Sequence, residues 1–503
     1  MNYPEIKTKI IEIVGIDNYT DEKDILINYS SSVNGTVIKP EGIVYPTTTN
    51  EVVDIVKLAN QSNSKLYPIS RGKNWGYGCA QGTEENQIIL ELSKMNKVLN
   101  IDQELCYMSL QPGVTQQQAY EYLEALPNTN LQLDVTGAGS EASIIGNILE
   151  KGFGHTDYGL KYVRVINMTI VLPDGEIIHT GFKAYKDANA QNTYRYGIGP
   201  CIDGLFFQSN LGIVVEMTIE LMPKPEKFCT VIGTAKNEDA ITNLILALRK
   251  LSLNGVINSM VHIGNKARII GDQKNTVVGA WSFSASISGY KKITKAKKYI
   301  VRKKIKKEVK GIKLWFITDF IIKWLGIFNK HVKPLSTFQT IKFLSDLQKG
   351  IPTNMPLKTL VNNDDIKLSD IKPHDFPVHF RWISAVCKAD AKSINQLFDT
   401  LRTNFELFNY EFRVTFTLIN GRNLIAIANI NYPKNETSIK KAAKFYKHCV
   451  KELIKKGFYP YRSGSNMYES LTGAEYSHRE LLKKIKQTID PNDIIAPIKY
   501  NIG

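Results

Sequence analysis

The chain has 503 residues, of which 43% are hydrophobic and 22% charged, and its formal net charge is +16. This profile excludes a disordered chain and predicts about two to four globular domains. The six cysteines are widely scattered and form no CxxC pair, so we expect neither a structural zinc ion nor any other metal, nor an attached haem. The opening Met1–Glu5 is polar, and we therefore expect a reduced cytoplasmic protein without an export signal.

The order of the predicted elements indicates an α+β fold. Asn50–Val56 is predicted to belong to an amphipathic helix with a Thr or Asn cap at its start. Gln87–Leu92 is predicted to be a strand. Strands and helices mix again from Phe228 to about Phe458, without a fixed repeat, and a last helix is predicted over Glu480–Thr488.

The segment Arg71–Gly78 contains three glycines behind an apolar run, and is the most informative part of the chain. Glycines at this density let backbone N–H groups close around an anion, because no Cβ blocks the approach. The segment matches neither the Walker loop nor the dinucleotide fingerprint. Taken by itself, it could equally be an ordinary turn.

Positive charge is concentrated between residues 291 and 310, where eleven Lys or Arg accompany one acid. No recognisable binding motif or interleaved aromatic pattern accompanies them, so we expect no nucleic-acid partner. The apolar stretch 314–328 follows, too short and too charged to span a bilayer. As a helix it would gather Asp319, Lys323 and Lys330 on one stripe. Segment 291–330 is then either a buried helix or subunit contact, or an interfacial membrane helix.

Seven motifs occur in family order and span most of the chain. Through them the chain resembles the FAD-linked flavoenzymes of the vanillyl-alcohol oxidase and p-cresol methylhydroxylase (PCMH) family. The motifs are Arg71–Gly78, Gln111–Thr115, Gly146–Gly154, Tyr196–Pro200, Gly204–Val214, Tyr461–Arg462 and Asp490–Pro497.

The resemblance implies a PCMH-type FAD-binding domain made of two α/β subdomains, with an inserted cap domain. Residues 1–224 and 456–503 would form the FAD-binding domain, with its core at about 38–225. Residues 225–455 would form the cap, an antiparallel sheet flanked by helices. The proline pair of Pro223–Pro225 marks the boundary.

The resemblance also implies three groups of FAD-binding residues. Backbone donors of the glycine-rich loop would hold the pyrophosphate: Arg71, Gly72, Lys73, Asn74, Trp75 and Gly76. Small residues would let the cofactor pass closely: Gly139, Ser140, Ser143, Gly146 and Asn147. An extended strand would lie against the adenine side: Gly212, Ile213 and Val214.

Two further residues are assigned to the flavin by resemblance. Lys499 matches the cation that the family places near the flavin N1–C2=O locus, where it would stabilise the anionic reduced flavin. His379 lies 82 positions before Tyr461 and would be the covalent attachment point. The alternatives are an ordinary hydrogen-bonded strand histidine, or attachment through His374.

Tyr77, Tyr461 and Arg462 match the family's phenolate-binding trio, which implies oxidation of a phenol. Two hydroxyls and a guanidinium converging on one oxygen favour its ionised form. A hydride would then pass from the benzylic carbon of a 4-alkylphenol or 4-hydroxybenzyl alcohol to flavin N5, leaving a quinone methide. The alternative interpretation is that Tyr461 and Arg462 are an ordinary pair of residues on the protein surface.

Two departures from the family pattern affect the substrate. The acid expected after Leu133–Val135 is missing, and Glu141 is the nearest substitute. Residues 423–428 are apolar where relatives place His and Glu. Another base would therefore serve the reaction, or the substrate is more apolar than a simple phenol.

Alternative functions stay open on the sequence alone. The chain could be a FAD-dependent oxidase or dehydrogenase of another lipophilic alcohol or natural-product intermediate. It could instead be a membrane-associated binding protein that keeps FAD as a structural ligand. The acceptor is either oxygen or an electron-transfer protein. We expect a homo-oligomer, with peripheral contact at the inner face of a membrane through 291–330 if that segment is interfacial.

Overall fold

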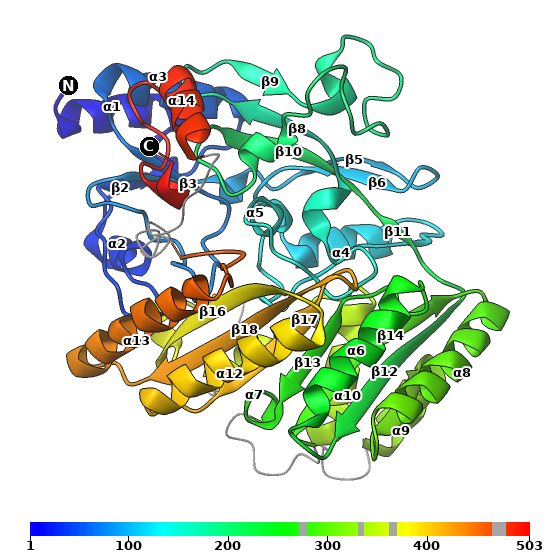
Figure 1. The fold of residues 1–503 in the computed structure, drawn as a ribbon. Coiled ribbons are helices and arrows are strands. Elements are labelled where there is room, and N and C mark those ends of the chain that lie inside the picture. The colour runs from blue at the N-terminus through cyan, green and yellow to red at the C-terminus, as the bar shows by residue number, and fades with distance from the viewer. Residues whose placement is uncertain (271–278, 330–335, 362–369, 465–478, 503) are drawn as a thin grey trace.

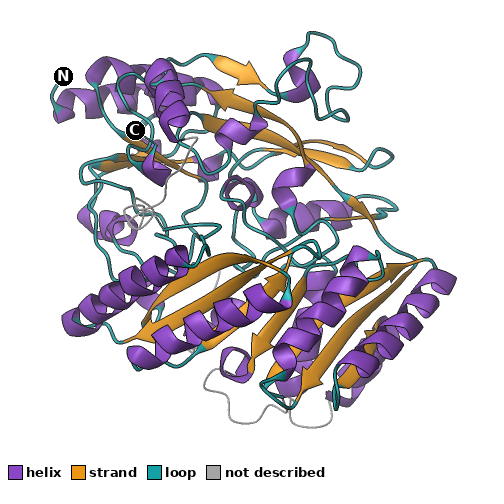
Figure 2. Cartoon of the chain, viewed as in Figure 1, coloured by secondary structure: helices purple, strands orange, loops and turns teal. Residues whose placement is uncertain are grey.

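The computed structural model describes residues 1–502 except 271–278, 330–335, 362–369 and 465–478 (Figure 1). Within these residues three main sheets of four, five and seven strands are surrounded by helices, as Figure 2 shows. The predicted α+β class is confirmed. In the described part of the chain, no helix has both the length and the apolar character needed to cross a membrane.

The four-stranded sheet lies nearest the N-terminus and has the order β1-β2-β4-β3. Strands β2, β4 and β3 are parallel. Its elements are α1 (Tyr3–Val14), β1 (Tyr19–Thr20), α2 (Lys23–Ser30), β2 (Gly42–Val44), α3 (Thr49–Ser62), β3 (Leu66–Ile69) and β4 (Ile88–Glu91). Helix α3 covers the predicted helix, and its cap is Thr48, which accepts a hydrogen bond from the Glu51 N–H.

The five-stranded sheet is antiparallel and has the order β5-β6-β10-β8-β9. Its strands and accompanying helices are β5 (Val98–Asp102), β6 (Tyr107–Leu110), α4 (Gln116–Ala125), α5 (Ile144–Leu149), β8 (Val165–Val171), β9 (Ile177–His179) and β10 (Ile213–Glu220). A separate short pair joins β7 (Leu131–Gln132) to β11 (Met222–Pro223).

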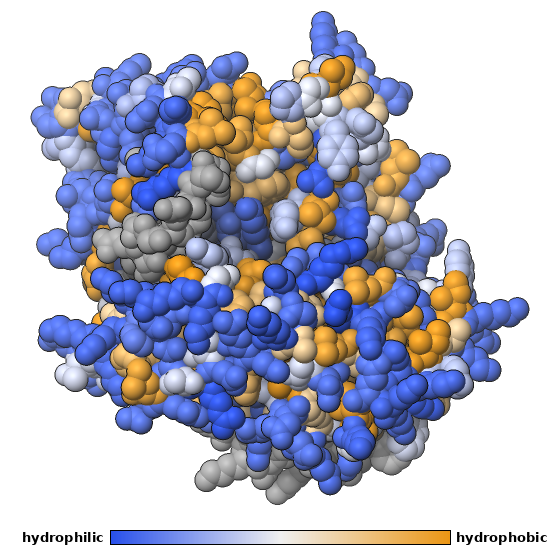
Figure 3. Space-filling view, viewed as in Figure 1, coloured by the Kyte–Doolittle hydropathy of each residue, from blue (hydrophilic) through white to orange (hydrophobic). Residues whose placement is uncertain are grey.

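The seven-stranded sheet is also antiparallel, with the order β15-β12-β14-β13-β17-β18-β16. Its strands are β12 (Lys227–Ala235), β13 (Val261–Asn265), β14 (Trp281–Gly289), β15 (Lys313–Thr318), β16 (His379–Lys388), β17 (Arg413–Leu418) and β18 (Asn423–Tyr432). Helices α6 (Ala240–Leu253), α8 (Lys291–Glu308), α12 (Ala391–Leu407) and α13 (Glu436–Lys455) share one core with it. Over α12 and α13 the outer surface is mostly hydrophilic (Figure 3).

Side chains alternate strictly between the two faces of this sheet, as the period of a β-strand requires. In β17, Val414, Phe416 and Leu418 join the helix-covered core. Arg413, Thr415 and Thr417 point to the opposite face, which lines a cavity. The sheet is therefore an apolar platform for helices on one side and a polar wall on the other.

The expectation of a single helix over 314–328 is wrong. Lys313–Thr318 forms strand β15, which pairs with β12 along the sheet edge, and helix α9 begins only at Asp319 and ends at Asn329. The run of Leu314–Thr318 contains aromatic and β-branched residues, which favour a strand once a neighbouring edge offers hydrogen bonds. Lys330 lies outside the described residues.

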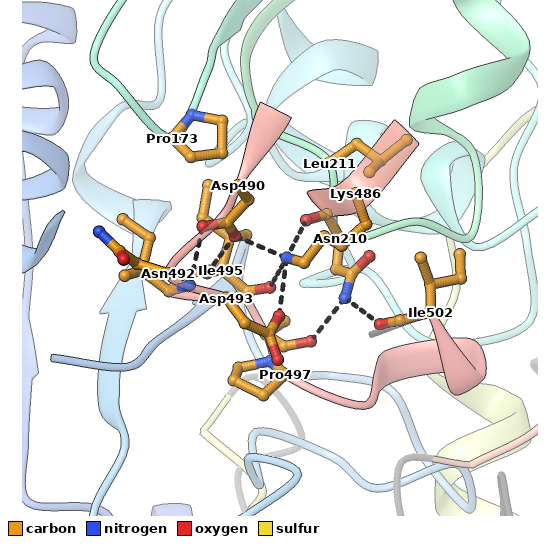
Figure 4. A network of polar contacts seen from close by, with 12 residues as sticks. Pro173, Asn210, Leu211, Lys486, Asp490, Asn492, Asp493, Ile495, Pro497 and Ile502 are labelled. Atoms are coloured by element: carbon orange, nitrogen blue, oxygen red, sulfur yellow. Dashed lines mark hydrogen bonds and ion pairs between the residues drawn. The ribbon is translucent and has the colours of Figure 1, made fainter. Parts of the chain in front are cut away.

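The C-terminal tail returns to the first sheet, where Leu66 forms a parallel bridge with Ile495. The last long helix, α14 (Arg479–Ile489), holds the tail through Lys486, whose ammonium is buried (Figure 4). The ammonium donates to the Asp490 carboxylate at 2.6 Å and to the carbonyls of Asn210 and Ile495 at 3.0 and 2.9 Å. This network fixes the path of the chain toward the cavity.

We predict that Lys486→Met destabilises the protein, because it leaves the buried Asp490 carboxylate without its nearest cation. Breaking a buried pair in this way costs about 3–5 kcal/mol. Urea unfolding should show this loss, whereas Lys484→Met, on the exposed side of the same helix, should change the free energy of unfolding by about 0.5 kcal/mol or less. Equal effects of the two variants would contradict this role of Lys486.

Candidate functional site

A cavity of about 1640 Å³ lies against the polar face of the seven-stranded sheet. The glycine-rich loop and the segment around Gly146 line another part of its wall. Helix α10 (Ser336–Gln348) contributes Phe343, Leu344 and Leu347, and α11 (Met355–Val361) adds further apolar wall. The cavity is therefore polar toward the sheet and apolar toward α10, as a site for a large, partly aromatic ligand requires.

The glycine-rich loop has the backbone conformation that its sequence predicts. Gly72 and Gly76 have φ values of +62° and +77°, which favour glycine. A Cβ on Gly76 would lie 2.1 Å from the Trp382 ring, so the loop can approach the sheet only without a side chain. Arg71 Nε is buried without a hydrogen-bond partner, as in a loop shaped to receive an anionic group.

The structure brings most of the predicted cofactor residues to the cavity wall. Those that line it are Arg71, Gly72, Lys73, Asn74, Trp75, Ser143, Gly146, Asn147, Gly212, Ile213, Val214 and Lys499. Gly76, Gly139 and Ser140 instead pack behind the wall. A Cβ on Gly139 would lie 2.5 Å from Leu357, and the Ser140 N–H donates to Asn354 at 2.8 Å.

Ser143 shows why small residues gather here. Its hydroxyl accepts a hydrogen bond from the Gly146 N–H at 2.9 Å and donates to the Pro112 carbonyl at 2.6 Å, capping helix α5. A Cβ on Gly146 would lie 2.9 Å from the Ser70 hydroxyl. The start of α5 thus meets the glycine-rich loop closely.

Tyr77, Tyr461 and Arg462 come together at the cavity although the loop and the C-terminal segment are far apart in sequence. The Arg462 guanidinium lies 4.6 Å from the centre of the Tyr77 ring. The Tyr77 hydroxyl is buried and makes no hydrogen bond in the described part of the chain. Burial raises the pKa of both tyrosines, and the positive charge of Arg462 lowers it by less. Both hydroxyls therefore stay protonated and can donate hydrogen bonds.

Glu150 holds this group together, and the sequence did not single it out. Its carboxylate pairs with Lys499 at 2.9 Å, lies 3.9 Å from Arg462 Nε and accepts from the Tyr500 hydroxyl at 2.5 Å. Burial raises the pKa of Glu150, but Lys499 and Arg462 outweigh it and lower the pKa to about 2. Its place in the motif Gly146–Gly154 was the only sequence signal.

Two histidines also line the cavity and were missed. The rings of His155 and His262 lie 4.2 Å apart, and Phe153 contacts both His262 and Tyr461. Burial lowers the pKa of His155 to about 3 and that of His262 well below its usual range, so both are neutral. No sequence motif indicated this pair of histidines. His155 lies in a loop and His262 in a strand, and the two segments meet only in the folded protein.

The structure places His379 outside the cavity. It precedes Trp382 by three positions in β16, so the two side chains point to opposite faces of the strand. Trp382 lines the cavity, whereas His379 lies 3.1 Å from the Val33 carbonyl and beside Tyr432. This geometry does not support flavin attachment through His379.

Glu141, the expected substitute for the missing acid, does not reach the cavity, and neither does Asp134. Glu141 pairs with Arg71 at 3.2 Å and is not among the lining residues. Asp134 is held by the N–H groups of His155 and Thr156 and lies 3.4 Å from the Lys161 ammonium. In the described part of the chain, His155 and His262 are the histidines on this wall.

Comparisons with known proteins agree with this site. Residues 40–181 match a family model described as "FAD binding domain". The 1'-carboxy-chondrochloren decarboxylase of Chondromyces crocatus is 26% identical, over 97% of this chain and 96% of that protein. The 4-cresol dehydrogenase [hydroxylating] flavoprotein subunit of Pseudomonas putida is also 26% identical, over 98% and 94%.

Two solved structures have the same fold. The substrate-bound crystal structure of p-cresol methylhydroxylase is similar with a TM-score of 0.88 and 25% identity, over 99% of this chain and 97% of that chain. The 4-ethylphenol oxidase of Gulosibacter chungangensis gives a TM-score of 0.88 at 20% identity, with the same coverage.

The fold and the glycine-rich cradle thus define a FAD-dependent oxidoreductase. The residues present fit that cofactor, because the glycine-rich loop and the start of α5 line the cavity together with the cations Arg71, Lys73 and Lys499. Within this class, the chain is similar over nearly its whole length to the 4-cresol dehydrogenase flavoprotein subunit and to p-cresol methylhydroxylase.

We predict that Glu150→Gln destabilises the protein at neutral pH by about 3 kcal/mol, the value that corresponds to its lowered pKa. This contribution is fully present above a pH of about 4.5, the ordinary pKa of Glu, and is lost as the pH falls toward 2. Urea unfolding should therefore show a gap between wild type and variant that narrows below pH 4.5. A gap independent of pH would contradict the pairing.

Proposed function

We propose that the protein oxidises a para-substituted phenol at its benzylic carbon. The observation that carries this proposal is the convergence of Tyr77, Tyr461 and Arg462 on one end of the cavity, with the Tyr77 hydroxyl buried and unbonded. A buried donor without a partner is costly unless a ligand supplies the acceptor. A phenolic oxygen is an acceptor of the right size.

The three side chains favour the ionised phenol for electrostatic reasons. Arg462 keeps its charge, because burial lowers its pKa but Glu150 and the neighbouring tyrosines together raise the pKa by more. Tyr77 and Tyr461 stay protonated and can donate to the same oxygen. A phenolate releases electron density toward its para substituent, so loss of a benzylic hydride gives a quinone methide. FAD, when bound, accepts that hydride at N5.

The relatives' names support this substrate class. One is named for 4-cresol and one structure for 4-ethylphenol, both para-alkylphenols. The alternative of another lipophilic alcohol or natural-product intermediate keeps the same cofactor but needs no phenolate trio. A binding protein that keeps FAD only structurally leaves the unbonded Tyr77 hydroxyl unexplained.

The cofactor residues are part of the proposal. We propose that Arg71–Trp75, Ser143, Gly146–Asn147 and the strand start Gly212–Val214 hold FAD, with Lys499 beside the flavin. Residues 1–224 and 456–503 would be the FAD-binding domain and 225–455 the cap. Three further points stay predictions from the resemblance: oxygen or an electron-transfer protein as the electron acceptor, covalent attachment of the flavin, and assembly into a homo-oligomer.

The decisive test is Tyr461→Phe. Removing one donor from a site that stabilises developing charge lowers a rate about 100-fold or more. We expect this loss in the rate at which a 4-alkylphenol bleaches the flavin of the purified protein without oxygen. Tyr459→Phe, which changes an exposed tyrosine two positions away, should leave the rate unchanged. Unchanged bleaching by Tyr461→Phe would refute phenolate stabilisation.

A second proposal concerns the edge of the sheet around β15. Helix α9 exposes Phe320, Trp324 and Ile327 on one face, with exposed fractions of 77%, 53% and 53%. The basic helix α8 flanks the same strand, because Lys298 and Arg302 contact Phe316. We propose that this edge lies peripherally on an anionic membrane surface.

Vesicle binding tests this surface. The protein should pellet with anionic vesicles at low salt and be released at high salt, because the basic residues supply part of the attraction. Replacing Phe320 and Ile327 together by Ser should weaken binding about tenfold. Leu105→Ser, an exposed apolar residue elsewhere, should have no effect. Equal pelleting of all three proteins would rule out α9 as the contact.

A further inference from the structure

One guanidinium on the cavity wall has no partner of opposite charge among the residues that the structure describes. Arg268 follows β13 in the short helix α7 (Lys266–Ile270), and its side chain lines the cavity. Its Nε is buried and without a hydrogen-bond partner, and none of the ion pairs of the described residues includes it. Its guanidinium lies over the face of the Trp382 ring, 5.1 Å from the ring centre.

The surroundings of Arg268 are positive rather than neutral. Burial and, to a smaller extent, the nearby Arg413 together lower the pKa of Arg268 to about 10. Arg413 also lines the cavity and pairs with Glu411 at 2.6 Å. The Arg268 side chain is nevertheless only half-buried by surface area, because it faces the cavity. A cation held in this way is costly unless an anion arrives.

The register of the sheet relates this cation to the phenol-binding end. Ser384 of β16 accepts a hydrogen bond from the Tyr461 N–H at 3.3 Å and donates to the Arg462 carbonyl at 3.1 Å. Trp382 lies two residues further along the same strand, about 7 Å away on the same face. Since Arg268 lies over Trp382, the cavity joins the two sites along one sheet face.

We propose that Arg268 binds a carboxylate on the substrate, at the end of the para substituent. The inference rests on the proposed function, and it narrows the substrate to a para-substituted phenol with a short carboxyalkyl tail. The phenolic oxygen would lie at Tyr77, Tyr461 and Arg462. The carboxylate would accept two hydrogen bonds from the Arg268 fork, including one from the unpartnered Nε.

Two matched ligands test this assignment: 3-(4-hydroxyphenyl)propanoate and its amide, which has the same shape without the charge. Flavin bleaching without oxygen gives the half-saturating concentration of each. Charge-assisted hydrogen bonds of this kind change affinity about 10- to 100-fold. We expect Arg268→Met to raise the value for the acid by that factor and to change the value for the amide less than about twofold. Lys266→Met, on the same helix and exposed, is the matched control.

A second measurement separates the inference from the proposed function. Thermal unfolding reports ligand binding without turnover, since a ligand that binds the folded state raises Tm. If neither ligand bleaches the flavin but the acid raises Tm more than the amide, and only with Arg268 present, the phenol oxidation fails and the carboxylate site stands. If both ligands bleach the flavin equally in wild type and Arg268→Met, the carboxylate site fails and the oxidation stands. Loss of FAD from the Arg268→Met variant would also overturn the carboxylate site, because Arg268 would then bind the cofactor.

Discussion

The buried carboxylate of Glu150 is the interaction on which the candidate site depends. It lies between Arg462 and Lys499, two cations that the chain delivers from its last fifty residues. An isolated buried cation is expensive, so the pairs hold the C-terminal segment against the FAD side of the cavity. The Lys486 network does the same at the base of the tail. Electrostatic pairing thus acts together with the buried tail residues Ile494, Ile495 and Ala496 to fix the position of the C-terminal segment.

The seven-stranded sheet supplies the second constraint. Its strands place apolar residues on the helix-covered face and Ser, Thr, Asn, His and Arg on the cavity face. The helices contribute the burial that stabilises the sheet, so the other face is free to carry polar groups. This division explains why a cavity of such size can hold several buried charges within a stable protein.

The charges in the cavity are distributed unequally. At the end of the cavity lined by Tyr77 and Tyr461, the cations Arg462 and Lys499 are matched by Glu150. Further along the same sheet face, the Arg268 Nε is buried and has no hydrogen-bond partner among the described residues. A matched pair stabilises the fold in the absence of ligand, whereas an unmatched cation gains its partner only from a ligand. The end of the cavity at Glu150 therefore needs no charged group from a ligand, whereas the end at Arg268 favours a ligand with a negative charge.

The sequence alone determined the α+β class, the capped helix α3 and the glycine-rich loop, because these depend on local periodicity and backbone freedom. Its motifs also indicated FAD and named the residues that would meet at the cavity. It did not predict strand β15, since a short apolar stretch becomes a strand only when another edge pairs with it. The outward position of His379, the histidine pair and the unmatched Arg268 were decided by the tertiary structure. Strand register and the packing of distant segments set which side chains share a face, and neither is encoded in local spacing.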